Sequence, residues 1–198
     1  MSSRAHAVRA LMLAAGFVIT SCSSAGSPAS SPTTPSQTAS QPSAPGTFTS
    51  ATYGYSVRLP VSWISAQATS KWDGHAGLTI ESPQVDKFES GSTAVLWATA
   101  APWSQDLAAW TTYAIHWTNQ FHGDSCTAAP ASTTPITIGG QPGVLLAYDC
   151  GVLINNAVTV HSGVGYWFVF RDPGVYAATD PTDHATFLTM LRSVQFPD

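Results

Sequence analysis

The sequence predicts an α+β fold in which an antiparallel β-sheet carries two packed helices. Three patterns support this prediction: alternating apolar side chains over residues 53–60, a Gly139-Gly140 pair between two β-rich runs, and a helical repeat over residues 104–121. Strands and hairpins around one long helix, followed by a second helix, are typical of this fold class.

The first strand is expected over residues 53–60, because every second side chain is apolar and Pro60 ends the run. The side chains that share its apolar face are Tyr53, Tyr55, Val57 and Leu59. Residues 78–82 and 93–99 are expected to form further strands, since both runs contain many β-branched or aromatic side chains.

A long helix is expected over residues 104–121, with Ser104 as its N-cap and Gly123 where the helix should end. The apolar residues that recur at helical spacing are Leu107, Trp110, Ala114, Trp117 and Phe121. This stripe predicts that one face of the helix packs on the sheet.

Two hairpins are expected next along the chain. Gly139-Gly140 lies within the β-rich run 135–148, and primed two-residue turns require the positive φ angles that glycine adopts readily. Ser162-Gly163 separates the β-rich runs 157–161 and 165–171 in the same way.

The second helix is expected to begin at Asp180-Pro181. Asp180 caps the helix, Pro181 takes its first turn, and Asp183 interacts favourably with the helix dipole. Its buried stripe is expected to contain Phe187, Leu188 and Leu191. Residues 193–196 are expected to add a closing strand.

A basic and then apolar leader precedes Cys22. Arg4 and Arg9 come first, an apolar run ends at residue 19, and Thr20-Ser21 stands directly before the cysteine. This arrangement resembles the lipobox of bacterial lipoprotein signal peptides, in which the cysteine becomes the lipidated first residue. The apolar run has about half of the roughly 20 residues that a spanning helix needs. Residues 1–21 are therefore interpreted as a cleaved signal peptide, the alternative being a retained helix.

Lipidation of Cys22 would place the protein at the outer face of the cytoplasmic membrane, because two acyl chains are enough for stable anchoring. The residues after Cys22, up to residue 46, are only Ser, Ala, Gly, Pro, Thr and Gln. Residues 22–46 are expected to form a disordered tether, since they cannot bury enough apolar surface to offset the entropy of ordering. Such a coil spans about 27 Å on average.

The three cysteines suggest one disulfide. If Cys22 carries lipid, Cys126 and Cys150 remain as a pair in an oxidising compartment and are expected to bridge. That bridge would stabilise the fold by about 3.5 kcal/mol in the chain-entropy description. The alternative is two buried free thiols.

Residues 47–198 are expected to form a single globular domain, since about 150 residues can bury a proper core. Without Arg4 and Arg9 the chain keeps five Lys and Arg residues against eleven Asp and Glu residues, and its basic residues never cluster. Nucleic acid and anionic membrane headgroups are therefore poor candidate partners.

Several motifs carry a resemblance that runs from about Phe48 to Pro197. They are Tyr53-Gly-Tyr-Ser-Val-Arg-Leu-Pro-Val-Ser-Trp63, Trp72-Asp-Gly74, the Gly139-Gly140 hairpin and Phe187…Leu191…Val194-Gln-Phe196. With them the chain resembles the PsbP-like α/β/α sandwich, and in particular the small PsbP-like lipoproteins of high-GC Gram-positive bacteria. The resemblance implies a sheet between helices and a role in binding other molecules. It implies no catalytic residues.

No motif in the sequence indicates a catalytic or metal-binding site. His116 and His122 are six residues apart and diverge on a helix, whereas a helical zinc site needs histidines three or four apart. The sequence contains no Gly-x-Ser-x-Gly, His-Glu-x-x-His or Gly-rich phosphate motif. Neither a metal nor a cofactor is predicted.

Tryptophan is the unusual residue, with seven copies. Most are expected in the core, because they lie in the predicted strands and helix: Trp97, Trp110, Trp117 and Trp167. Trp72 and Trp103 are flanked by loop residues, where a ring can stack on a ligand. The candidate ligand-binding patch therefore contains Trp72, Asp73, His75 and Trp103.

The leading functional hypothesis is a lipid-anchored, non-catalytic binding module of the cell envelope. Its ligand would be an envelope glycan, a small apolar molecule or another envelope protein. One alternative is an envelope hydrolase whose site is assembled from residues distant in sequence. Another is an accessory subunit with an exposed apolar patch and no pocket. An open apolar cleft between the sheet and the 104–121 helix would favour binding.

Overall fold

The computed structural model describes residues 46–61, 63–75, 77–90, 94–122, 126–172 and 181–198. The predicted signal peptide 1–21, Cys22 and the tether up to residue 45 lie outside the described residues. The predicted helix-ending Gly123 and the predicted cap Asp180 lie outside them as well.

In the described part of the chain the structure has nine strands and two helices. The strands are β1 (Gly46–Thr49), β2 (Ser56–Leu59), β3 (Ile64–Ala66), β4 (Asp86–Glu89), β5 (Val95–Pro102), β6 (Ser132–Ile138), β7 (Gln141–Asp149), β8 (Leu153–His161) and β9 (Val164–Asp172). The helices are α1 (Leu107–His122) and α2 (Pro181–Ser193). The first strand includes Gly46, one residue before the expected start of the domain.

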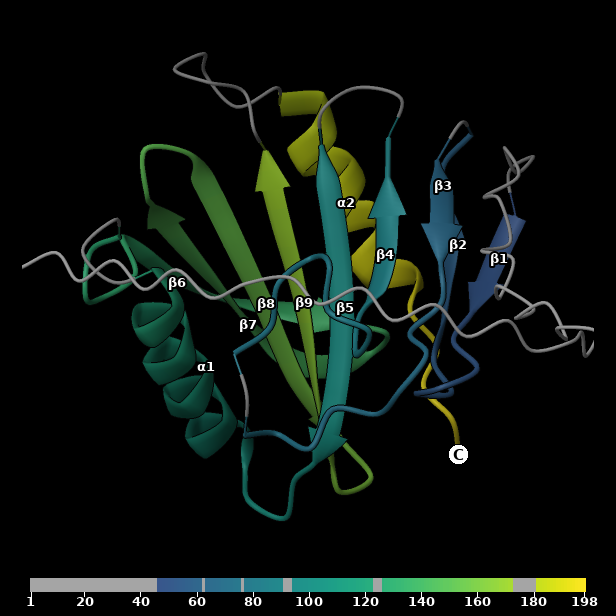
Figure 1. Ribbon diagram of the computed structural model, residues 1–198, viewed down its shortest axis with the longest axis horizontal. Helices are drawn as coiled ribbons and strands as arrows, with labels where there is room; N and C mark the ends of the chain where they lie inside the picture. Colours follow the sequence, from purple (N-terminus) through teal and green to yellow (C-terminus); the bar gives the residue numbers. More distant parts are fainter. Residues whose placement is uncertain (1–45, 62, 76, 91–93, 123–125, 173–180) are drawn as a thin grey trace, which may run out of the picture. The chain divides into compact units, whose positions relative to one another are not determined.

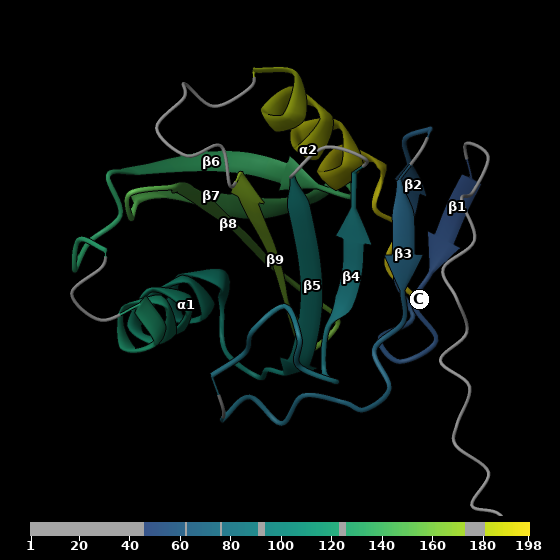
Figure 2. The same ribbon diagram turned by 45° about the horizontal axis from the view of Figure 1, so that its top comes forward.

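Seven strands form one antiparallel sheet in the order β3-β4-β5-β9-β8-β7-β6, and β1 and β2 form a separate two-stranded ribbon (Figure 1). The two helices cover opposite faces of the large sheet (Figure 2). The predicted α+β class and the α/β/α arrangement are thus confirmed.

Both predicted hairpins are confirmed. Gly139 and Gly140 have φ angles of 55° and 81° and close a two-residue turn between Ile138 and Gln141. Ser162 and Gly163, at 47° and 77°, close the equivalent turn between β8 and β9. Positive φ at both central residues is the geometry that suits the twist of the flanking strands.

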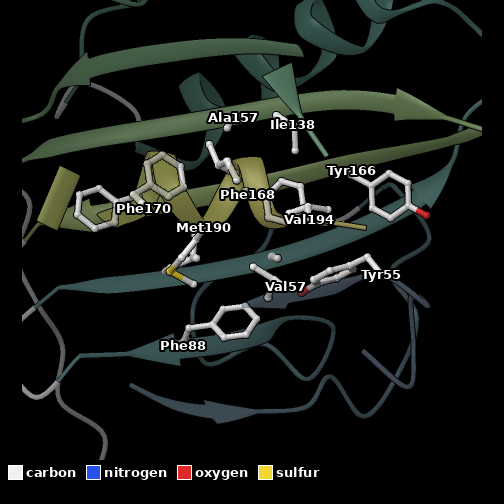
Figure 3. Close-up of a cluster of buried hydrophobic side chains, with 14 of the residues drawn as sticks. Tyr55, Val57, Phe88, Ile138, Ala157, Tyr166, Phe168, Phe170, Met190 and Val194 are labelled. Carbon is white, nitrogen blue, oxygen red and sulfur yellow. The ribbon is translucent and has the colours of Figure 1, made fainter. Parts of the chain in front are cut away.

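Strand alternation divides the core in two. Along β9, Tyr166, Phe168 and Phe170 face α2, whereas Trp167 and Val169 face α1. Figure 3 shows the α2-side core, in which Phe168 and Phe170 lie among side chains from the ribbon and from α2. The alternation follows from the two-residue period of a strand.

The first predicted strand is shorter than expected. Tyr55, Val57 and Leu59 are buried as predicted, but the strand begins at Ser56 and Tyr53 lies in the preceding turn. Gly54, with a φ angle of 78°, accounts for the difference, because it turns the chain between Tyr53 and the strand.

The strand predicted over residues 78–82 is wrong, because these residues form a turn. Ser82 Oγ accepts a hydrogen bond from the Thr79 N–H, and Thr79 Oγ1 accepts one from the Glu81 N–H. Such local side-chain bonds satisfy the backbone without a neighbouring strand. The strand predicted over 93–99 is confirmed from Val95 onward as β5, which continues to Pro102, and residue 93 lies outside the described residues.

Asp106, rather than the predicted Ser104, caps α1. Its Oδ1 accepts a hydrogen bond from the Ala109 N–H at 2.9 Å, and its carbonyl accepts the Trp110 N–H. Trp110 is fully buried, and its indole N–H donates to the Tyr166 carbonyl at 3.0 Å. The helix therefore begins three residues later than its first predicted residue.

The C-terminal predictions are confirmed in part. α2 begins at Pro181, Phe187 and Leu191 are buried, and Leu188 is half-buried. The expected closing strand over residues 193–196 is reduced to one antiparallel bridge between Gln195 and Ser56.

Asp86 is a fully buried carboxyl at the start of β4. The Tyr55 hydroxyl donates to its Oδ2 at 2.9 Å, and the Ala68 N–H donates to its Oδ1 at 2.8 Å. Burial raises the pKa of Asp86, and hydrogen bonds from Ala68, Ser50 and Tyr55 oppose part of the rise. This carboxyl links the β1–β2 ribbon to the edge of the large sheet.

Gly139→Ala should lower the free energy of unfolding more than Gly140→Ala. A Cβ on Gly139 would stand 2.5 Å from the Val194 carbonyl oxygen, whereas a Cβ on Gly140 meets nothing within 4 Å. We expect losses of about 3 and about 1 kcal/mol, since both share the positive-φ penalty and only the first adds overpacking. Urea denaturation measures both, and equal losses would contradict the packing of this turn on the end of α2.

Asp86→Ala should destabilise the fold by about 2–3 kcal/mol at pH 7, because the Tyr55 hydroxyl and the Ala68 N–H lose their acceptor. The folded pKa of Asp86 is raised, so its contribution is largest below the unfolded value of about 3.9 and falls as pH rises through the folded value. Urea denaturation at pH 3.5 and pH 7 should show the larger loss at pH 3.5. Asp149→Ala, at an exposed carboxylate, is the control at pH 7.

Candidate functional site

An apolar cleft opens on the α1 side of the sheet, and we call it the α1 cleft. It lies between the C-terminal end of α1, the loop 77–80 and strands β5, β8 and β9, and its volume is about 200 Å³. Its lining residues are Leu78, Thr79, Ile80, Val95, Trp97, Phe121, Ile154, Val169 and Arg171. A smaller hollow of about 30 Å³ adjoins it and adds Gly77, Trp117, Thr118, Asn156 and Trp167.

Strand register brings the floor of the cleft together. Val95 lies opposite Arg171 and Trp97 lies opposite Val169 in the β5–β9 pair, and Ile154 lies opposite Arg171 in the β8–β9 pair. Directly opposed side chains on one face are about 5 Å apart. These residues therefore form a continuous surface although they lie far apart in the sequence.

Phe121 forms the helical wall of the cleft. The stripe predicted for this helix included Phe121 among the packed residues, and this is wrong, because its side chain is 48% exposed. α1 is buried through Trp110, Ala114 and Thr118, spaced four residues apart. Phe121 takes nearly the same direction around the helix axis as Trp110, but it lies in the last turn of α1, where it projects over the loop at Gly77.

The polar groups of the site are few. Thr118 Oγ1 accepts a hydrogen bond from Asn156 Nδ2 at 2.8 Å in the floor of the hollow. The Trp167 indole N–H is buried and has no acceptor among the described residues. Arg171 is exposed at the edge of the cleft. The arrangement suits a largely apolar ligand with one or two polar groups.

The predicted disulfide between Cys126 and Cys150 is confirmed, with its Cα atoms 4.2 Å apart and a sequence separation of 24. Cys126 follows α1 by four residues, and Cys150 directly follows β7. The bond therefore ties the segment after α1 to the β7–β8 turn. It restrains the end of the helix that carries Phe121.

An aromatic cluster continues inward from the cleft. Ring centroids of neighbouring members are 4.8–6.2 Å apart, which is the range of favourable aromatic contacts. Its members are Trp72, Trp97, Trp103, Trp110, Tyr113, Trp117 and Trp167. Trp110 and Trp167 are buried as predicted, but Trp97 and Trp117 remain partly exposed and line the site.

The residues of the predicted ligand patch lie elsewhere. Trp72 is only 3% exposed and contacts Trp110, because the loop that carries it fills the space between α1 and the sheet. Trp103 is half-buried against the same ring. Asp73 and His75 are exposed, and Asp73 Oδ1 accepts the His75 N–H in a local turn. None of the four lines the α1 cleft.

Sequence reasoning missed the actual lining residues Val95, Ile154, Phe121 and Arg171 as a site. Each belongs to a regular strand or helix and looks locally like a packing or surface position. The only available signal was indirect: the pairing of the two hairpin strands with β5, which places these side chains on one face.

A serine–histidine contact occurs outside the cleft. Ser162 Oγ lies 3.2 Å from His161 Nε2, and the same nitrogen lies 3.1 Å from the Pro197 carbonyl oxygen. A carbonyl oxygen only accepts, so Nε2 carries the proton in that hydrogen bond and cannot also take one from Ser162. This arrangement does not support the hydrolase alternative.

Two further features concern only the described residues. No three His, Cys, Asp or Glu side chains come together there in a way that could hold a metal ion. None of the helices in that part of the chain is long and apolar enough to span a membrane.

The fold is PsbP-like. The structure is similar to the solution structure of cyanobacterial PsbP (CyanoP) from Synechocystis sp. PCC 6803, with a TM-score of 0.53 and 15% sequence identity over 77% of this chain and 92% of that chain. A crystal structure from Bacteroides thetaiotaomicron VPI-5482 matches with a TM-score of 0.40 and 12% identity, over 73% of this chain and 45% of that one. No protein-family model and no curated protein match the sequence.

Proposed function

We propose that this protein is a non-catalytic binding module that holds a small apolar molecule in the α1 cleft. The observation that carries this proposal is the cleft itself, in which rings and aliphatic side chains face an open space between helix and sheet. An apolar cavity of about 150 Å³ is known to bind benzene. A cleft of about 200 Å³ suits one or two rings or a short chain.

The other two ligand classes fit the cleft less well. An envelope glycan needs several hydrogen-bonding groups around a stacking ring, whereas this cleft offers mainly apolar atoms. A partner protein commonly covers about 800 Å² on each side, far more than a cleft of this size provides. A small apolar molecule therefore remains the best-supported ligand.

Val95→Trp should weaken binding of a neutral aromatic probe, naphthalene-2-carboxamide, by about tenfold, because the larger side chain fills the cleft. Isothermal titration calorimetry would measure this with the full chain carrying Cys22→Ser, which avoids detergent. Val61→Trp adds the same ring at an exposed position outside the cleft and should leave the affinity unchanged. Equal affinities for the two variants would exclude the cleft as the site.

We further propose that the protein is a PsbP-like lipoprotein of a high-GC Gram-positive bacterium, anchored to the outer face of the cytoplasmic membrane through Cys22. The supporting features are the basic and apolar leader, the small residues before Cys22 and the uncharged tether after it. The disulfide is a further supporting feature, because such bonds persist mainly outside the reducing cytosol.

Cys22→Ala should move the protein out of the lipid-anchored fraction, since no thiol remains to accept the acyl chains. Detergent phase partition and metabolic labelling with a palmitate analogue would measure the change in an actinobacterial host. Ser21→Ala keeps a small residue before the cysteine and should stay labelled. A Cys22→Ala variant that is still labelled and membrane-bound would refute the anchor.

A further inference from the structure

Arg171 stands where the α1 cleft meets solvent. It belongs to the same alternating row of β9 as Trp167 and Val169, so its side chain leaves the sheet on the α1 side. Its opposed neighbours, Val95 on β5 and Ile154 on β8, are both apolar and both line the cleft. The arginine is thus the charged group at the edge of an apolar floor.

The carboxylates near this edge are already paired with another cation. Lys87 Nζ lies 3.3 Å from Glu81 and 3.1 Å from Glu89. Glu89 lies opposite Val95, and Val95 lies opposite Arg171, so two strand spacings of about 4.8 Å separate the two charged residues. Within the described residues no carboxylate lies in ion-pair distance of Arg171.

We infer that the ligand of the α1 cleft is a small amphipathic anion whose apolar body lies against Trp97, Phe121 and Val169 and whose carboxylate or phosphate pairs with Arg171. This inference rests on the proposed function, because it assigns a chemical class to the ligand of the same cleft.

The chemistry of arginine favours such an oxyanion. Its planar guanidinium donates two parallel hydrogen bonds to a carboxylate or a phosphate and stays charged at every physiological pH. The apolar neighbours Val95 and Ile154 exclude water from one side of the pair, which strengthens the attraction over that of a fully solvated pair. A ligand without an anionic group would form no ion pair with Arg171.

The half-exposed ring of Phe121 supports the position of the apolar body. It is one of two large hydrophobic side chains that are strongly exposed in the described part of the chain, the other being Val61. Phe121 and Arg171 line the same cleft, one on the helix wall and one on the sheet. A molecule with an apolar body and one anionic end matches both.

Three probes of nearly the same shape test the inference: 2-naphthoate, 2-naphthyl phosphate and the neutral naphthalene-2-carboxamide. Titration calorimetry with the full chain carrying Cys22→Ser should show at least one anion binding about tenfold more tightly than the amide, in line with a charge-assisted hydrogen bond. Arg171→Gln should remove this preference and leave amide binding unchanged. Arg58→Gln, at an exposed arginine outside the cleft, should keep the preference.

The outcomes separate the inference from the function on which it rests. If the amide and both anions bind equally and Arg171→Gln changes nothing, the anionic class is wrong and the apolar binding module stands. If no probe binds, both proposals fall. A preference for phosphate alone or carboxylate alone supports the inference and identifies the headgroup. Circular dichroism of the Arg171→Gln variant verifies that the fold is intact.

Discussion

The close contact between Trp110 and Gly165 positions everything else on the α1 side of the sheet. A Cβ on Gly165 would stand 2.6 Å from the indole ring, so only glycine lets the helix approach the sheet this closely. The indole N–H donates to the neighbouring Tyr166 carbonyl, which fixes the ring in depth and orientation. Because Trp110 lies near the start of α1, this contact seats the N-terminal half of the helix. The C-terminal half of the helix forms one wall of the α1 cleft through Phe121.

The two faces of the sheet differ in how completely they are covered. The α2 side is a closed core, whereas the α1 side contains the open α1 cleft. On the α2 side, the ribbon, the helix and the C-terminal residues enclose a core of aromatic and aliphatic side chains, and the buried Asp86 joins the ribbon to it. On the α1 side the aromatic cluster is closed around Trp110 but open around Trp97 and Phe121. The disulfide joins the segment after this end of α1 to the β7–β8 turn. A ligand would complete the packing at the open end of the cluster.

Much of the fold could be predicted from local sequence because its causes are local. The Gly139-Gly140 and Ser162-Gly163 turns need positive φ, and few residues other than glycine supply it. The stripe around Trp110 predicted α1, but Asp106 rather than Ser104 is its cap and Phe121 is exposed. Local sequence does not decide between two neighbouring capping residues, nor does it show what covers the last turn of a helix. The strand predicted over residues 78–82 was wrong although these residues include β-branched side chains. Hydrogen bonds within the segment, from the Thr79 and Glu81 N–H groups to side-chain hydroxyls, stabilise a turn there instead.

By itself the sequence predicted the antiparallel α+β fold and the turns that join its hairpins, and it favoured the pairing of Cys126 with Cys150 on the condition that Cys22 is lipidated. Only the tertiary structure decided which aromatic rings are covered and where the cleft opens. The physical reason is that the two-residue period of a strand predicts on which face of the sheet a side chain lies. It does not predict whether a helix or loop covers that side chain. Trp72 stands between Lys71 and Asp73, and Trp97 stands in an apolar strand, yet Trp72 is the more deeply buried ring. One is buried beneath α1, and the other borders open space, because the helix covers only part of the sheet.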